Sequence, residues 1–344
     1  MEQNRERSHA RLFLTAGILA LIVLGVGIYF GKAGIGSFIS AGSTGKIEKL
    51  STLTAQSSFS EVIGFVIKKY EIDKKHGLDI EFVSNPPGDL ERRYLAGETP
   101  LMNLGIIFGA EAYKHGIPST LIGPGLRMSY EVAVRPSSPI RSLEELKGKL
   151  FGVLPKTTAG YSSMEIVFRS AGINPSELSF LYGSVPEINQ RLLVGTIDAG
   201  MVSYPFGAAL FGSEAVRSIA TLEEVWESNE DGLPMPLAVI GVRDDWYKQN
   251  KRLAKKYVDM WTEGSRMLVE NPRLIDEFPD YLKANRLDSP AALALLHEKI
   301  PKIIMTEWTD REIKGIERFF ERAKEYGFVS ADTKPPKIIP YHKL

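Results

Sequence analysis

The chain has 344 residues, 44% of them hydrophobic, which is enough for one large domain or two medium-sized ones. Lysine and arginine together number 42, as do aspartate and glutamate, and this zero net charge argues against a nucleic-acid-binding protein, whose surface is basic. Cysteine is absent, which excludes disulfides, thiol catalysis, zinc sites with cysteine ligands and a lipid-modified N-terminal cysteine.

The first distinctive segment is an uncharged apolar run at residues 12–31, preceded by a basic N-terminus and followed by Lys32. A helix needs about 20 apolar residues to cross a bilayer, whereas the core of a signal peptide has about 7–15. The length predicts a transmembrane anchor, with residues 1–11 in the cytoplasm and the rest of the chain outside. The small residues of SFISAGST (37–44) leave a cleaved signal peptide as the alternative. Residues 32–46 are rich in glycine, serine and alanine and are expected to form a flexible linker.

From residue 47 the pattern alternates between short strands and amphipathic helices, which is typical of α/β proteins with helices on the faces of a mostly parallel sheet. In the first half we expect strands at 49–54, 78–84, 100–105, 119–125 and 130–136, and helices at 60–77, 88–97 and 107–116. In the second half we expect strands at 149–155, 178–184, 197–203 and 237–243, and helices at 142–148, 161–171, 185–195 and 205–212. The helix at 142–148 is expected to begin at a serine cap, Ser142, with Glu145 at its third position. Residues 244–328 are expected to be almost entirely helical.

Two such blocks joined by extended segments predict two lobes with a cleft between them. We expect residues 47–134 and 238–344 to form the first lobe with its helical tail, and residues 135–237 to form the second lobe. Ligands of open α/β sheets bind beyond the carboxyl ends of the strands. Polar residues that follow the predicted strands are therefore the candidates for a ligand site.

Four segments, in this order and spacing, resemble a known family, and the resemblance covers about residues 47–211. The segments are KKYEIDKKHGLDIEFV (68–83), LAGETPLMNLG (95–105), SLEELKGKLFGVLPKTTAGYSSMEIVFRSAGINPSELSFL (142–181) and LLVGTIDAGMVSYPFGAAL (192–210). They resemble the substrate-binding proteins of ABC importers for nitrate, taurine, aliphatic sulfonates and thiamine-pyrimidine precursors.

The resemblance implies a two-lobed, periplasmic binding protein-like fold of type II that closes on a small anionic or heterocyclic ligand. It further implies a monomer without a cofactor or metal, located on the extracytoplasmic face of the membrane, that delivers its ligand to an ABC permease subunit. The alternatives are an enzyme on the same fold, of the thiamine-pyrimidine synthase or menaquinone-pathway type, and a sensory ectodomain.

The polar break KTTAGY (156–161) lies where a strand ends and a helix begins. A helix start offers free backbone N–H groups and a partial positive charge, which suits an anion. In the family, the corresponding segment lies at the cleft, so we expect Lys156, Thr157, Thr158 and Tyr161 to contact the ligand, with Gly160 allowing close approach. The alternative is that one threonine merely caps the helix while Lys156 points into water.

Other candidates follow the strands of both lobes. Gln56 and Ser57 come after the first predicted strand. The resemblance implies that they contact the ligand. The alternative is that they only precede a helix capped by Ser58 or Ser60. Asn103 is expected either to bind the ligand or to tie down its own turn. Tyr204 could stack on a planar ligand, or pack between the lobes. Met128 is expected to contribute an apolar wall.

Catalytic patterns are absent from the sequence. The five histidines are scattered without metal-ligand spacing, and no nucleophile elbow, Walker A loop or His-Glu-x-x-His motif occurs. Paired acids such as Glu223 and Glu224 are expected to be solvated helix caps. The sequence therefore favours a binding protein over an enzyme.

Overall fold

The computed structural model describes residues 47–344 except residue 87. The predicted membrane anchor at residues 12–31 and the linker at residues 32–46 lie outside the described residues. Within the described part of the chain, no helix combines the length and the hydropathy needed to cross a bilayer.

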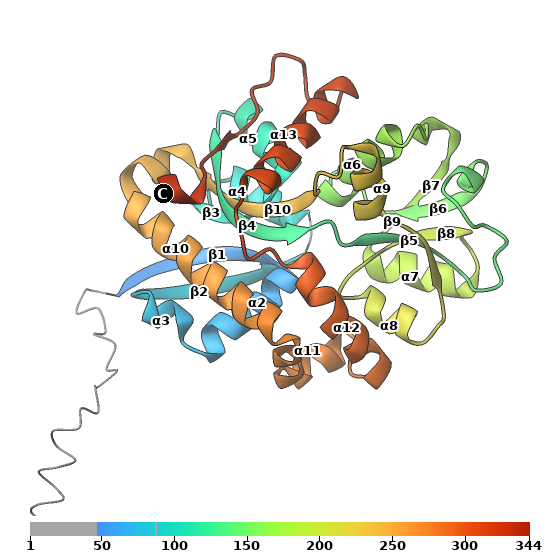
Figure 1. Ribbon diagram of the computed structural model, residues 1–344, viewed down its shortest axis with the longest axis horizontal. Helices are drawn as coiled ribbons and strands as arrows, with labels where there is room; N and C mark the ends of the chain where they lie inside the picture. Colours follow the sequence, from blue (N-terminus) through green and yellow to red (C-terminus); the bar gives the residue numbers. More distant parts are fainter. Residues whose placement is uncertain (1–46, 87) are drawn as a thin grey trace, which may run out of the picture. The chain divides into compact units, whose positions relative to one another are not determined.

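The first sheet has six strands in the order β11-β4-β10-β3-β1-β2 (Figure 1). β1 runs parallel to β2 and β3, whereas β10 runs antiparallel to both of its neighbours, β3 and β4. The strands are β1 (Glu48–Ala55), β2 (Leu78–Asn85), β3 (Leu101–Gly105), β4 (Ser119–Arg127), β10 (Pro236–Arg243) and β11 (Lys337–Ile338).

The second sheet has five strands in the order β7-β6-β8-β5-β9. β6 is parallel to β7 and β8, and β5 is antiparallel to β8 and β9. The strands are β5 (Tyr130–Val134), β6 (Leu150–Val153), β7 (Ser179–Tyr182), β8 (Ala199–Ser203) and β9 (Arg217–Thr221). This arrangement confirms an α/β, two-sheet architecture in which β10 returns to the centre of the first sheet.

The chain crosses between the sheets twice. The first crossing joins β4, which ends at Arg127, to β5, which starts at Tyr130, and the second leads into β10. Because residues 130–134 pair with β8 and β9, they lie in the second sheet, and the first crossing comes earlier than the boundary at residue 134 expected from sequence. The two crossings touch, since the Met128 amide donates to the Met235 carbonyl at 2.9 Å.

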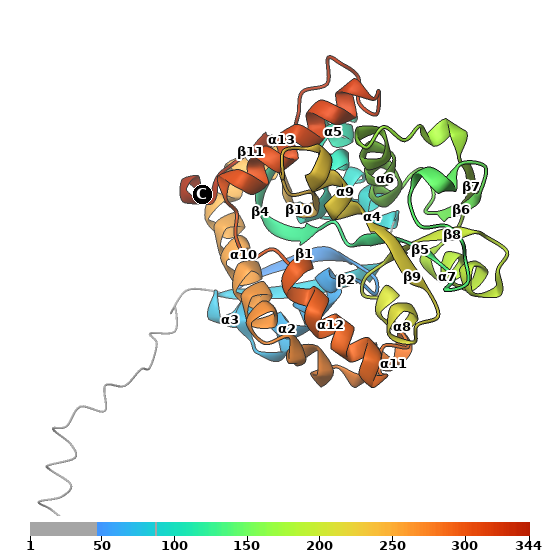
Figure 2. The same ribbon diagram turned by 45° about the vertical axis from the view of Figure 1, so that its right-hand side comes forward.

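Helices cover both sheets, and the C-terminal ones span from one sheet to the other (Figures 1 and 2). α10 packs on α2, β4 and β10, while α12 packs on α8 beside the second sheet. The helices are α2 (Phe59–Lys69), α3 (Ile72–Lys75), α4 (Asp89–Leu95), α5 (Ile106–Lys114), α6 (Ala159–Ser170), α7 (Val185–Val194), α8 (Gly207–Gly212), α9 (Leu222–Asn229), α10 (Asp244–Glu270), α11 (Pro279–Ala284), α12 (Pro290–Ile303) and α13 (Asp310–Glu325). Short 3-10 helices occur at Glu144–Leu146, Pro175–Glu177, Pro272–Glu277 and Tyr341–Lys343.

The single helix predicted for residues 60–77 is wrong, because the chain breaks it into α2 and α3. Glu71 adopts a left-handed conformation with φ 52°, which redirects the backbone between the two helices. The turn buries Asp73, whose carboxylate accepts from the Ile80 amide at 3.2 Å and pairs with Lys68 at 2.6 Å. A straight helix could not place this carboxylate against β2.

Two further short helices differ from the sequence prediction. The helix expected at residues 142–148 is reduced to a 3-10 turn at Glu144–Leu146, and Ser142 does not occupy its cap. Glu145 instead accepts a hydrogen bond from the Arg141 amide at 2.8 Å. The extent of α9 was not predicted, although Glu223 and Glu224 were expected to cap a helix. Thr221 is its cap and accepts from the Glu224 amide.

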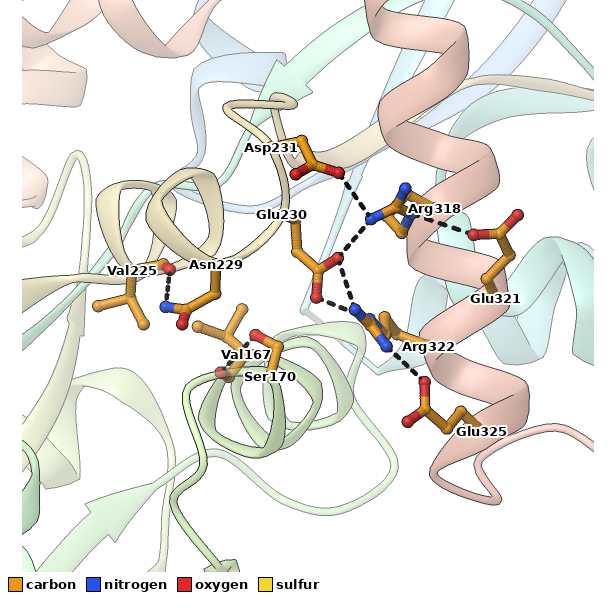
Figure 3. Close-up of polar contacts among 10 residues, drawn as sticks. All are labelled: Val167, Ser170, Val225, Asn229, Glu230, Asp231, Arg318, Glu321, Arg322 and Glu325. Atoms are coloured by element: carbon orange, nitrogen blue, oxygen red, sulfur yellow. Dashed lines mark hydrogen bonds and ion pairs between the residues drawn. The ribbon is translucent and has the colours of Figure 1, made fainter.

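A buried ion cluster joins the helical tail to the second sheet's helices (Figure 3). Glu230, directly after α9, has a fully buried side chain whose carboxylate accepts from Arg322 at 2.7 and 3.1 Å. Arg318, one turn earlier on α13, donates to the same carboxylate at 3.0 Å. Both guanidinium groups remain partly exposed, so Glu230 is the member of the cluster that depends most on its partners.

We predict that Glu230→Gln lowers the free energy of unfolding by about 3 kcal/mol, because the change leaves two arginines without their shared buried counter-charge. Urea unfolding monitored by tryptophan fluorescence measures the effect. Glu321→Gln is the matched control, since Glu321 also pairs with Arg318 but its side chain is 71% exposed, and we expect at most about 1 kcal/mol there. Equal losses in the two variants would contradict a special role of Glu230.

Candidate functional site: a cleft between the two sheets

A cleft of about 860 Å³ lies between the two sheets. Its walls come from the ends of β1, β3, β6 and β8, the starts of α2, α6 and α7, and α11 of the tail. The first crossing also contributes through Ser129, and β10 contributes through Leu237. The carboxyl ends of strands from both sheets therefore meet at one cavity, as expected for open α/β sheets.

The structure brings six of the nine predicted site residues to this cleft and leaves three outside its walls. Those that line the cleft are Gln56, Ser57, Asn103, Thr157, Thr158 and Tyr204. Those that do not are Met128, Lys156 and Tyr161.

The three residues outside the walls have other surroundings. Met128 is buried at the first crossing and its amide bonds to Met235. Lys156 is exposed, and its Nζ lies 5.7 Å from the centre of the Tyr182 ring. The ring of Tyr161 lies 5.8 Å from the same tyrosine ring, so it packs within the second lobe.

The two threonines at the start of α6 have different roles. Thr158 is buried, and its Oγ1 accepts from the Tyr161 amide at 3.3 Å while donating to the Pro155 carbonyl at 2.8 Å. Its hydroxyl hydrogen is therefore already used in the helix cap. Thr157 is exposed and faces the cleft. Of the two hydroxyls, that of Thr157 is the one left for a ligand.

Gly160 makes room for a neighbouring side chain. A Cβ atom at this position would lie 2.8 Å from the hydroxyl of Tyr130 and equally close to Leu154. The glycine therefore allows Tyr130, which lines the cleft, to approach the start of α6.

Asn103 lies in the middle of β3, opposite Ile240 of β10, and its amide reaches the cleft. Both the Oδ1 and the Nδ2 atoms are buried and have no hydrogen-bond partner among the described residues. Gly125 of β4 gives the amide space, since a Cβ there would lie 2.9 Å from Oδ1. A buried amide without partners is costly, and a ligand in the cleft would satisfy it.

Tyr204 is held firmly at the wall of the cleft. Its ring stacks on Phe211 with centroids 5.9 Å apart, and the ammonium of Lys299 lies 4.9 Å from its centre. Lys299 also pairs with buried Glu131 at 2.7 Å. Because Lys299 belongs to α12, the helical tail helps to position this aromatic wall.

Sequence reasoning missed several residues that line the cleft, among them Glu61, Glu91 and Tyr281. Glu61 accepts from the amide of Ser57, which has φ 56°, at 2.6 Å. Tyr281 comes from α11 of the tail, and its buried hydroxyl has no partner among the described residues. No sequence spacing relates a tail helix to the strand ends, whereas Glu61 and Glu91 each lie in the first turn of a helix that follows a strand.

Glu223 is not a solvated cap, in contrast to the sequence prediction. Its carboxylate accepts from the Met235 amide at 3.3 Å and lies 3.6 Å from Arg127, at the two crossings. Burial raises the pKa of Glu223 to about 7, although Arg127 and the Met235 amide oppose this rise. Residues 47–344, with position 87 left out, contain no group of three or more histidine, aspartate or glutamate side chains that could hold a metal ion.

Comparisons with known proteins agree with this architecture. The NMT1/THI5-like family model matches residues 74–275. No curated protein sequence matches the chain. Among solved structures, the alkanesulfonate-binding protein of Xanthomonas axonopodis pv. citri bound to MOPS has 15% identity and a TM-score of 0.68, covering 86% of this chain and 99% of that one.

Two more structures resemble the chain to a similar degree. The periplasmic aliphatic sulphonate-binding protein of Escherichia coli has 15% identity and a TM-score of 0.66, covering 83% of this chain and 95% of that one. A ligand-binding component of an ABC-type import system from Staphylococcus aureus, with zinc bound, has 14% identity and a TM-score of 0.62, covering 87% and 99%. At these identities the likeness establishes the fold.

We predict that Thr158→Ala lowers the free energy of unfolding by about 1 kcal/mol, because it removes the cap of α6. Thr157→Ala is the control, since the same side chain is lost one residue earlier without loss of a cap, and we expect a change within about 0.5 kcal/mol. Chemical denaturation of the two variants distinguishes the roles. A larger loss for Thr157→Ala would show that the cap lies elsewhere.

Proposed function

The chain belongs to the NMT1/THI5-like family, the kind of protein expected from its sequence, and we propose on this basis that it captures a small solute in the cleft between its sheets. In this proposal it is the solute-binding component of an ABC importer. The solute is a small anionic or heterocyclic compound, of the sulfonate, nitrate, taurine or thiamine-pyrimidine-precursor class. The observation that carries the proposal is the cleft itself, with unpartnered polar groups in its walls.

The walls of the cleft combine apolar and polar surfaces as small-molecule sites do. Phe59, Phe206 and Tyr204 provide aromatic surface, whereas Asn103 and Tyr281 contribute buried polar atoms without partners. Buried polar groups without partners destabilise the free protein, and a bound solute that pairs with them regains that free energy. The cleft therefore supports specific binding of a small molecule that presents both a flat apolar part and polar groups.

Capture is proposed to couple to closure of the lobes about the two crossings. The residues proposed to bind come from both sheets, Asn103 from the first and Thr157 and Tyr204 from the second. A solute that touches both sets makes its full contacts only when the lobes are closed, and this differential contact drives closure. The closed form would then deliver the solute to an ABC permease subunit.

The place of action is proposed to be the extracytoplasmic face of the membrane, with the protein as a monomer held there by residues 12–31 or released if that segment is cleaved. A binding role is favoured over the enzyme on the same fold. Support comes from the two sulfonate-binding proteins and the import component that share the fold.

The proposal is tested by the melting temperature of the full chain in detergent, recorded against nitrate, sulfate, bicarbonate, taurine, alkyl and aryl sulfonates, riboflavin and aminopyrimidines. A solute that binds only the folded state, present at about 100 times its Kd, adds about 2.7 kcal/mol of stability. We expect one class to raise the melting temperature and to be recovered unchanged. Chemical conversion of the bound compound would favour the enzyme instead.

We predict opposite effects on stability and binding for Asn103→Leu. Stability should rise by about 1 kcal/mol because an unpartnered buried amide is removed, while affinity for the compound found in the melting assay should fall by about tenfold. Asn85→Leu is the matched control, because Asn85 ends β2 with its amide bonded to Val83 and Arg93. It should lose stability. A loss of stability in Asn103→Leu as large as in the control would show that its amide is already satisfied.

A further inference from the structure

The charged side chains that line the cleft, among the described residues, are all acidic. Within the described residues that line it, the charged side chains are Glu61 and Glu91, and neither lysine nor arginine is among them. The predicted cation Lys156 instead lies near the ring of Tyr182, outside the cleft walls. A free anion in the cleft would therefore meet two carboxylates without a facing cation, which is unfavourable in a partly desolvated site.

The helix starts that face the cleft carry side chains of the protein itself. At α2, the carboxylate of Glu61 accepts from the Ser57 amide. At α6, Thr158 accepts from the Tyr161 amide, and at α7, Glu187 closes a capping box. The partial positive charge at two of these helix starts is thus already offset by a carboxylate. This arrangement reduces the attraction that a helix start otherwise exerts on an anionic ligand.

One carboxylate oxygen of Glu91 has no hydrogen-bond donor among the described residues. Glu91 lies in the first turn of α4, just beyond the end of β2, and its Oε2 is buried without a partner among the described residues. Burial raises the pKa of Glu91, and the backbone amides of Glu91 and Gly88 oppose part of this rise. These amides do not account for Oε2 of Glu91, which has no donor among the described residues although Glu91 lines the cleft.

We propose that the solute carries a basic or N–H-bearing nitrogen, as in an amine, an amidine or an aminoheterocycle, and that the carboxylate of Glu91 binds this nitrogen. The inference rests on the proposed function of the cleft and names the chemical class of its ligand. A sulfonate group in the same solute is compatible with it, whereas an anion without such a nitrogen is not bound well. Phe206 and Tyr204 provide aromatic surface at the cleft for the carbon part of the compound.

The pH dependence of binding follows from the surroundings of Glu91. Burial raises the pKa of Glu91, and Glu111 on α5 raises it further. Tyr130 on β5 is half-buried near it. Arg92 and Arg93 on its own helix pair with Asp89 and Glu98. Because the nitrogen is held by the ionised carboxylate, affinity should fall as the pH drops through this raised pKa. A free anion would show the reverse trend, since protonation of Glu91 removes repulsion.

The test compares matched compounds on the full chain in detergent by isothermal titration calorimetry. Taurine is paired with ethanesulfonate, and 4-amino-5-hydroxymethyl-2-methylpyrimidine is paired with its 4-hydroxy analogue. We expect one amino compound to bind at least about tenfold more tightly than its partner, the effect of a charge-assisted hydrogen bond. Equal or tighter binding of the partner compound overturns the inference and leaves solute capture intact. If no member of either pair binds, the proposed function fails for these classes and the inference falls with it.

Two variants assign the effect to one carboxylate. Glu91→Gln should reduce the affinity for the amino compound by about tenfold or more and remove its fall at low pH, while the partner compound is unaffected. Glu111→Gln removes an equal charge on the adjacent helix outside the cleft and should leave the preference for the amino compound unchanged. A preference that survives in Glu91→Gln overturns the role of Glu91. Unchanged thermal unfolding in the absence of compounds shows that both variants are folded.

Discussion

The ion pairs of Arg127 connect the two crossings between the sheets with α9 and α13. Its guanidinium pairs with Glu312 of α13 at 2.6 Å and lies 3.6 Å from Glu223 of α9. Glu223 in turn accepts from the Met235 amide on the second crossing. One side chain at the end of β4 thus joins both crossings, a helix of the second lobe and a helix of the tail. The position of the cleft depends on this junction, because the chain passes from one sheet to the other at the two crossings and the cleft lies between the sheets.

The helical tail constrains how the lobes can move. α12 packs on α8 and carries Lys299, while α13 carries the two arginines that surround Glu230. The same tail is joined to the first sheet, where the Met305 amide donates to the Gly125 carbonyl of β4 at 3.0 Å. Breaking a buried ion cluster costs about 3–5 kcal/mol. This is about the whole binding free energy of a solute with a Kd near 1 mM, which is about 4 kcal/mol. The Glu230 cluster therefore opposes any movement that would separate the end of α9 from α13.

Sequence periodicity located most strands well, since each buried run ends where polarity returns, and Tyr204, directly after β8, was found in this way. Asn103 was expected to follow its strand but lies in the middle of β3. Periodicity could not show which way a side chain points, so Lys156 was expected at the cleft although it packs toward Tyr182. It also could not bring Tyr281 to the cleft, because that contact depends on how a distant tail helix packs. Glu223 was taken for a surface acid because its burial arises only when the two crossings meet.

The segment Lys156–Tyr161 shows why a local pattern does not determine the charge of a ligand. A lysine, two threonines and a glycine at a helix start suit an anion and an ordinary cap equally well. The distinction comes from the opposite lobe, where Glu61 and Glu91 face the same cavity without a cation among the described lining residues. The electrostatics of a cleft are the sum over both walls, and a carboxylate on one wall outweighs a partial helix charge on the other.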